Sequence, residues 1–170
     1  GKNRSAYSRR FISALGARTG TVFGAYSDRD LYRFLREGRT DIFRQISDQI
    51  SEAALKQGCD QIVCDAVEHY NPMHDIANII AHLVSQTVAA RTGIEPDVLT
   101  SDIRGKRPHS QAHLTVSALP DEIGHKLDAA MAYFPLADEV ADYRDKLCAT
   151  DEALFDDPGF DWPEALTGAL

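Results

Sequence analysis

The residues best suited to chemistry lie in one short stretch, residues 65–75, which reads Asp-Ala-Val-Glu-His-Tyr-Asn-Pro-Met-His-Asp. Imidazole and carboxylate together form the usual ligand set of protein-bound zinc, and carboxylates also orient ligating histidines. Backbone amides at the start of a helix would favour an oxyanion formed nearby. His69 and His74 do not have the spacing of a two-histidine helical site. A hydrogen-bonded capping loop therefore stays an alternative to a metal or catalytic role.

The elements on either side of this stretch would hold it at the end of a sheet. The short apolar run at 61–65 predicts a buried strand. Pro72 fits the first turn of a helix, and apolar residues recur at helical spacing from Ile76 to Val88, until Gly93. In a parallel sheet, ligands bind where the carboxyl ends of the strands meet. We therefore expect the functional crevice at the 65–75 loop.

The rest of the chain alternates helical patterns with short apolar runs. We expect helices at 4–15, 40–57, 123–134 and 137–155, and strands at 21–25, 96–100 and 112–118. This alternation predicts an α/β fold, three-layered and Rossmann-like, with a mostly parallel sheet flanked by helices. We expect one domain over residues 1–170, with an irregular tail at 156–170.

Composition excludes several classes of function. The chain has 170 residues and a net charge of −8, which argues against bulk binding of nucleic acid or anionic membranes. No apolar run is long enough to cross a bilayer. Three cysteines are too few for a disulfide framework, so a reducing, cytoplasmic compartment is the simpler interpretation. Self-association into a homo-oligomer is compatible with the sequence.

The stretch from Ala66 to Asp75 resembles the signature loop of the PIG-L (LmbE-like) zinc-dependent N-deacetylases. In that family the string Ala-Tyr-Glu-Gly-Gly-His-Pro-Asp-His-Asp follows a strand and opens a helix. Further likenesses extend over nearly the whole chain, at Arg4 with Leu15-Gly16, Gly24 to Asp28, His125-Lys126 with Tyr133, and the tail at 157–162. The resemblance implies a PIG-L-like α/β fold and a zinc-dependent amide hydrolase that acts on an N-acetylated, sugar-like small molecule.

The resemblance also implies roles for individual residues. His74 falls on a zinc-ligand position, and Asn71 falls on a histidine that polarises the substrate or tetrahedral intermediate. Glu68 matches the loop glutamate, and Arg4 and Asp28 match positions that line the substrate cleft. The sequence departs from the pattern as well: Asn71 cannot transfer a proton near neutral pH, although it can donate a hydrogen bond to an oxyanion.

The largest departure is the absence of a His-Pro-Asp-Asp string, which in the family follows the first strand and supplies two zinc ligands and the general base. One histidine cannot hold catalytic zinc, which needs about three protein ligands. Two interpretations remain open. Either the sequence lacks its first strand and the segment that carries those ligands, or the chain is an inactive binding or assembly domain that has lost the zinc site. A sheet without that strand would expose apolar edges, which favours the first interpretation.

Other polar residues have simpler interpretations. His82 is expected to be a solvated or interhelical histidine, and His109 and His113 to flank a surface loop. Cys64 is expected to be buried in a strand rather than to act as a nucleophile.

Overall fold

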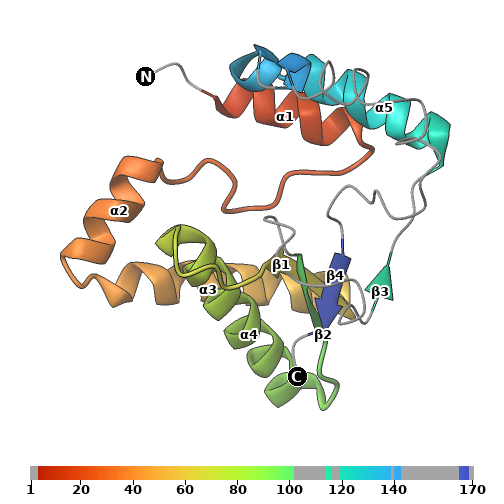
Figure 1. Ribbon diagram of the computed structural model, residues 1–170. Helices are drawn as coiled ribbons and strands as arrows, with labels where there is room; N and C mark the ends of the chain where they lie inside the picture. The colour runs from red at the N-terminus through yellow and green to blue at the C-terminus, as the bar shows by residue number, and fades with distance from the viewer. Residues whose placement is uncertain (1–3, 102–113, 116–118, 139, 143–164, 169–170) are drawn as a thin grey trace. The chain divides into compact units, whose positions relative to one another are not determined.

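The computed structural model describes residues 4–101, 114–115, 119–138, 140–142 and 165–168 of the chain (Figure 1). The chain divides into two compact units. One comprises Gly1–Thr19 with Ser117–Trp162, and the other comprises Gly20–Val116 with Pro163–Leu170. None of the helices in the described ranges is both long and apolar enough to cross a membrane.

The helices of the second unit begin and end where their capping residues predict. Ser27 caps the first of them by accepting a hydrogen bond from the amide of Asp30 at 3.2 Å. The two longer helices stop at Gly58 and Gly93, whose φ angles of 62° and 77° are accessible to glycine without steric cost. The described helices of this unit are α2 (Asp28–Arg36), α3 (Thr40–Gln57) and α4 (Pro72–Thr92).

The strands of this unit form a sheet of mixed direction. β1 (Gln61–Asp65) and β2 (Asp97–Ser101) pair in parallel, joined by the α4 crossover. β4 (Ala165–Gly168) pairs antiparallel with β2 and with β3 (Leu114–Thr115), so the order is β1-β2-β4-β3. The expected parallel pairing is therefore found at β1 and β2, whereas β3 and β4 add antiparallel pairings.

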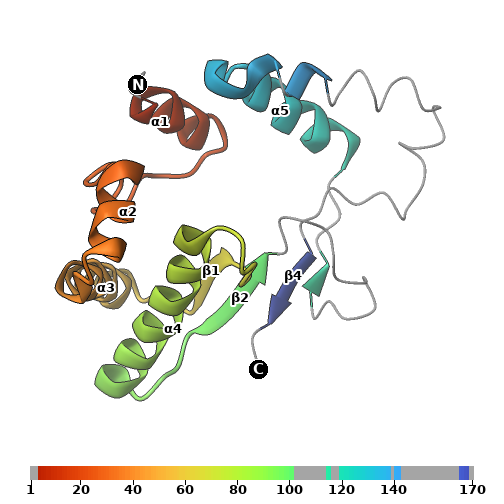
Figure 2. The same cartoon turned by 60° about the vertical axis from the view of Figure 1, so that its left-hand side comes forward.

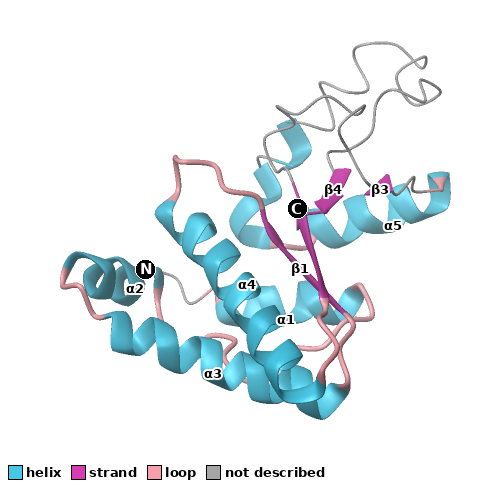
Figure 3. Cartoon of the chain, turned by 90° about the horizontal axis from the view of Figure 1, so that it is seen from below, coloured by secondary structure: helices cyan, strands magenta, loops and turns pink. Residues whose placement is uncertain are grey.

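The core of the unit lies between α3, α4 and β1. Small residues on both helices allow close packing, and Ala54, Val84 and Val88 are 7%, 0% and 4% exposed. Ile62 of β1 packs against this cluster. In the view of Figure 2, α3 lies on one side of β1 and β2 lies on the other. The described fold is thus a mostly helical α/β arrangement in which the parallel strand pair packs against helices, as Figure 3 also shows.

The first unit is held by aromatic side chains. Its described elements include α1 (Ser5–Ala14), α5 (Pro120–Met131) and the short 3-10 helix η2 (Phe134–Leu136). The rings of Tyr7 and Phe11 contact Tyr133 edge-on at centroid distances of 6.4 and 6.0 Å. The hydroxyls of Ser8 and Tyr133 are 3.2 Å apart, within hydrogen-bonding distance, and link the two chain segments that make up the unit.

Two expectations about secondary structure are wrong. Residues 21–25 form turns rather than a strand, with hydrogen bonds from Phe23 N to Gly20 O and from Ala25 N to Val22 O. Glycine before and within this short run favours turns, and no neighbouring strand pairs with it. The tail expected to be irregular contains β4, because β2 and β3 supply non-local hydrogen-bond partners that a sequence pattern does not reveal.

Two further expectations fall partly outside the described residues. Only Leu114–Thr115 of the expected 112–118 strand is described, as β3. Of the helix expected at 137–155, residues 137–138 and 140–142 are helical and the remainder lies outside the description.

Candidate functional site

The loop between β1 and α4 lies at the carboxyl ends of the parallel strands, as the sequence predicts. Asp65 is the last residue of β1 and is in register with Ser101, the last residue of β2. The amide of Ala66 donates to the carbonyl of Ser101 at 2.9 Å, which fixes the start of the loop beside the end of β2. The chemistry-bearing side chains therefore gather at the edge of the sheet where α/β proteins bind ligands.

Asp75 fixes the backbone of the loop. Its Oδ1 accepts hydrogen bonds from the amides of Glu68 at 2.8 Å and of His69 at 3.3 Å. His69 has a φ of 55°, in the left-handed region that non-glycine residues rarely adopt. A carboxylate in the first turn of α4 also interacts favourably with the helix dipole. Asp75 thus holds a strained turn that aims the Glu68 side chain inward.

Asn71 caps α4 and accepts hydrogen bonds from the backbone amides of its first turn. Its Oδ1 accepts from the amide of Met73 and from the hydroxyl of Tyr32, both at 3.0 Å. The amides of His74 and Asp75 donate to the Asn71 carbonyl at 3.0 and 3.3 Å. The expectation that these amides could face an oxyanion is therefore wrong, because each already has an acceptor. Within the described ranges the Asn71 Nδ2 group has no acceptor, so it can donate to a ligand.

Glu68 and His74 form a close pair at the loop, in which the Glu68 side chain is buried and the His74 side chain is 32% exposed. The Glu68 side chain is 6% exposed, and its Oε2 lies 3.2 Å from His74 Nδ1. The Glu68 Oε1 and His74 Nδ1 atoms are buried without a hydrogen bond among the described residues, because this approach lacks hydrogen-bond alignment. The carboxylate of Asp65 lies 3.8 Å from the same ring nitrogen. Two carboxylates therefore face one side of the imidazole, which leaves Nε2 as the nitrogen for a ligand.

The neighbouring strand end supports this pair and contains no reactive thiol. Asn78, which is buried in α4, donates to the carbonyl of Asp65 at 3.0 Å and lies 3.6 Å from the sulfur of Cys64. Burial, with a smaller effect of the Asp65 charge, raises the pKa of the Cys64 thiol. A raised pKa keeps the sulfur protonated near neutral pH, which agrees with the structural role expected for Cys64.

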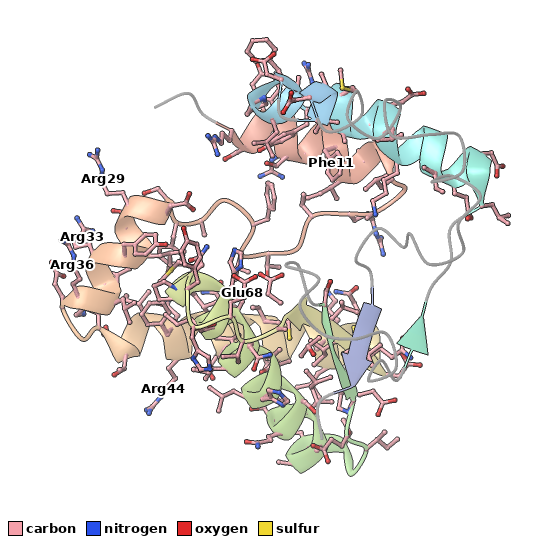
Figure 4. All side chains as sticks on the ribbon, in the orientation of Figure 1. Phe11, Arg29, Arg33, Arg36, Arg44 and Glu68 are labelled. Carbon is pink, nitrogen blue, oxygen red and sulfur yellow. The ribbon has the colours of Figure 1, made fainter. Side chains whose placement is uncertain are left out.

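Four arginines of α2 and α3 extend away from the loop. Figure 4 shows Glu68 at the loop, while Arg29, Arg33 and Arg36 extend from the outer side of α2 and Arg44 extends from α3. Arg33 is paired with Asp30 at 3.1 Å. The basic group beside the buried Glu68 carboxylate is thus the His74 imidazole at 3.2 Å, rather than one of these guanidinium groups.

The remaining predicted site residues are not joined to the loop by a described contact. Asp28 is exposed in the first turn of α2, and no hydrogen bond or ion pair among the described residues links it to Glu68 or His74. Arg4 precedes α1 in the other unit, so its place in a cleft stays a prediction. Sequence reasoning missed Tyr32, whose hydroxyl holds Asn71, because nothing in an exposed helical tyrosine marks a contact 39 residues away.

The donor set does not by itself complete a zinc site. Within the described ranges, no three His, Cys, Asp or Glu side chains are arranged to hold a metal ion. His74 supplies one ligand nitrogen, and both nearby carboxylates lie on its Nδ1 side. Zinc would need further ligands from outside these residues.

Comparison of the chain with protein-family models, curated proteins and solved structures finds no match.

Proposed function

We propose that the 65–75 loop is the histidine-bearing part of a hydrolase site of the N-deacetylase type, with an N-acetylated, sugar-like small molecule as substrate. The observation that carries this proposal is the Glu68–His74 pair at the carboxyl end of β1. A histidine that ligates a metal or transfers a proton commonly has its second ring nitrogen against a carboxylate. The Glu68 side chain is 6% exposed, so its carboxylate costs free energy to desolvate, and a charged imidazole beside it would offset part of that cost.

Each residue of the site has a role that follows from its contacts. Glu68, 3.2 Å from Nδ1, would orient the imidazole and stabilise its positive charge when Nε2 holds a proton. Asp65, which is partly exposed and 3.8 Å from the same nitrogen, would add to this stabilisation of the imidazolium charge. Asn71 could donate from Nδ2 to the oxygen of the tetrahedral intermediate. Arg4 and Asp28 belong to the proposal as substrate-binding residues on the resemblance alone.

Zinc belongs to this proposal only as a condition. Bound zinc lowers the pKa of a ligating water and polarises a carbonyl. The described residues supply one histidine for it, so the remaining ligands would have to come from other parts of the polypeptide. The proposal also includes a PIG-L-like, Rossmann-like layered sheet and a reducing, cytoplasmic compartment. Cys59 and Cys64 are both free thiols, which supports the latter.

A second candidate is a binding or assembly domain with the same fold and no zinc. The observation that favours it is the missing three-ligand set among the described residues. In this case the Glu68–His74 pair would bind a polar group of a sugar-like ligand without hydrolysing it. Both candidates predict that His74 matters for ligand binding, but only the enzyme predicts acetate release.

The test measures zinc content and acetate release from N-acetylglucosamine derivatives, with and without a chelator. We expect His74→Ala to lose zinc and activity. Glu68→Gln should weaken zinc binding by about 10–100-fold, as for other carboxylates that orient a ligating histidine. His82→Ala is the matched control, because His82 lies on the same helix and has no contact with the loop pair among the described residues. If the chain neither retains zinc nor releases acetate, the hydrolase proposal fails and the binding domain is favoured.

A further inference from the structure

α3 and α4 form an apolar groove along their outward sides, with Leu35 of α2 at one end. The volume of the groove is about 520 Å³. Its lining includes Ile79 and Leu83, which lie on a different side of α4 from the core residues Val84 and Val88. Three of its large apolar side chains are exposed, Leu35 by 39%, Ile79 by 56% and Leu83 by 45%. Exposed apolar side chains gathered on one face commonly mark a surface that another molecule covers.

The charges of the groove indicate what kind of molecule this is. Among the described residues that line it, the charged ones are Arg44 and Asp48. Both are exposed on α3, and neither has an ion pair or a hydrogen bond with another described residue. One cation and one anion give the lining no net charge, so it favours neither an acidic nor a basic partner. The same surface of a second copy, turned end for end, is complementary to it, because each cation then faces an anion.

The exposed apolar residues of α4 fit the same symmetry. Ile79 and Leu83 are four residues apart, about one helical turn, as are Arg44 and Asp48. α3 and α4 run in the same general direction, since an ion pair joins their carboxyl-terminal halves. The charged pair therefore lies alongside the apolar pair in the groove. One two-fold axis that crosses both helices midway along these turns would bring Arg44 to Asp48 of the second copy and Ile79 to Leu83 of the second copy.

We propose that the α3–α4 groove binds the α3–α4 groove of a second copy of this chain, with the helices of the two copies antiparallel. The exposed apolar side chains of each copy would enter the groove of the other, and their removal from water would stabilise the dimer. The Arg44 and Asp48 pairs at the rim would fix the relative direction of the copies. The proposal does not depend on the hydrolase function.

The first test measures the dissociation constant of the full chain by sedimentation equilibrium. We expect a dimer in the parent. Ile79→Glu places a charge in the interface twice per dimer and should raise the dissociation constant about 100-fold or more. Ile94→Glu is the matched control, because Ile94 is 71% exposed beyond the end of α4 and outside the groove. Its dissociation constant should stay within about threefold of the parent's.

The second test uses two charge reversals. Arg44→Asp brings acidic groups together across the interface, and Asp48→Arg brings basic groups together, so each should weaken the homodimer about tenfold or more. In a mixture of the two variants, each position again faces an opposite charge, and a heterodimer should form with a dissociation constant within about threefold of the parent's. A variant that had lost its fold could not be rescued in this way. Lys56→Asp makes the same change in charge at an exposed position of α3 outside the groove and should leave the dimer intact.

Four results would overturn the proposal. A parent chain that stays monomeric at about 1 mM would show that another part of the chain or a different molecule covers the groove. A dimer that Ile79→Glu leaves unchanged would be formed by another surface. Failure of the mixed charge variants to associate would refute the antiparallel arrangement. Association that continues beyond two copies would refute the two-fold axis, because an isologous interface closes at the dimer.

Discussion

The two ends of α4 differ in how completely their polar groups are satisfied. At the carboxyl end, Ser85 donates to the carbonyl of Pro96 at 2.8 Å, and the hydroxyl of Thr92 donates to Val88 at 2.9 Å. At the amino end, the buried Glu68 Oε1 and His74 Nδ1 atoms have no hydrogen bond within the described ranges. The polar groups at the carboxyl end of α4 therefore have hydrogen-bond partners, whereas buried polar atoms at its amino end lack them among the described residues.

This difference indicates what each end is for. A buried polar atom without a partner costs about 1–3 kcal/mol, so such atoms persist where a ligand or reaction uses them. The hydrogen bonds described at the carboxyl end join groups of the fold to one another. The amino end contains contacts of both kinds, since Asp75 and Asn71 hold the loop while Glu68 and His74 stay available. The comparison predicts that variants at the two ends separate stability from binding.

The largest effect on stability is expected from Asp75→Ala. The variant leaves the amides of Glu68 and His69 without their acceptor, at a cost of about 2 kcal/mol in the free energy of unfolding. Urea denaturation monitored by circular dichroism measures this cost. Asp48→Ala, at an exposed position of α3, is the control and should change the free energy by less than about 0.5 kcal/mol. Equal losses in the two variants would mean that Asp75 does not anchor the loop.

Ser85→Ala tests the carboxyl end of the same helix. It leaves the buried carbonyl of Pro96 without its donor, and we expect a loss of about 1–2 kcal/mol in the free energy of unfolding. Metal or ligand binding at the amino end should be unchanged in the folded variant. A loss of binding that matches the loss in Asp75→Ala would remove the distinction between the two ends.

Asn71→Ala tests whether Asn71 acts only as the cap of α4 or also contributes to catalysis. Loss of the cap should cost about 1 kcal/mol, measured from the shift in the urea midpoint. Tyr32→Phe removes only the exposed hydroxyl that donates to the same oxygen and should cost about 0.5 kcal/mol or less. Under the proposed function, Asn71→Ala should also lower turnover about 100-fold, whereas Tyr32→Phe should not. If both variants lower turnover equally, Asn71 acts only through its position.

Local signals predicted the elements around the candidate site well. The 61–65 run is β1 at the expected bounds, Pro72 begins α4, and Gly58 and Gly93 stop their helices in the left-handed conformation. These features depend on residues a few positions apart, so one sequence reveals them. The expectation that the 61–65 strand is buried is wrong, because its residues are exposed or partly exposed in the described structure. The strand expected at 21–25 failed because an apolar run forms a strand only where a partner strand is available.

The sequence by itself determined the order strand, polar loop, helix, and therefore placed Glu68, Asn71 and His74 at the end of a parallel strand pair. Tertiary structure alone decided which of their atoms are used. It aims Glu68 at His74 Nδ1, gives the first amides of α4 to Asn71, and brings Tyr32 to the cap. It also decided that β4 joins the sheet and that the outer edge of β1 has no described partner. Chain-local preferences fix elements, whereas hydrogen-bond partners and burial depend on residues that are distant in sequence and meet only on folding.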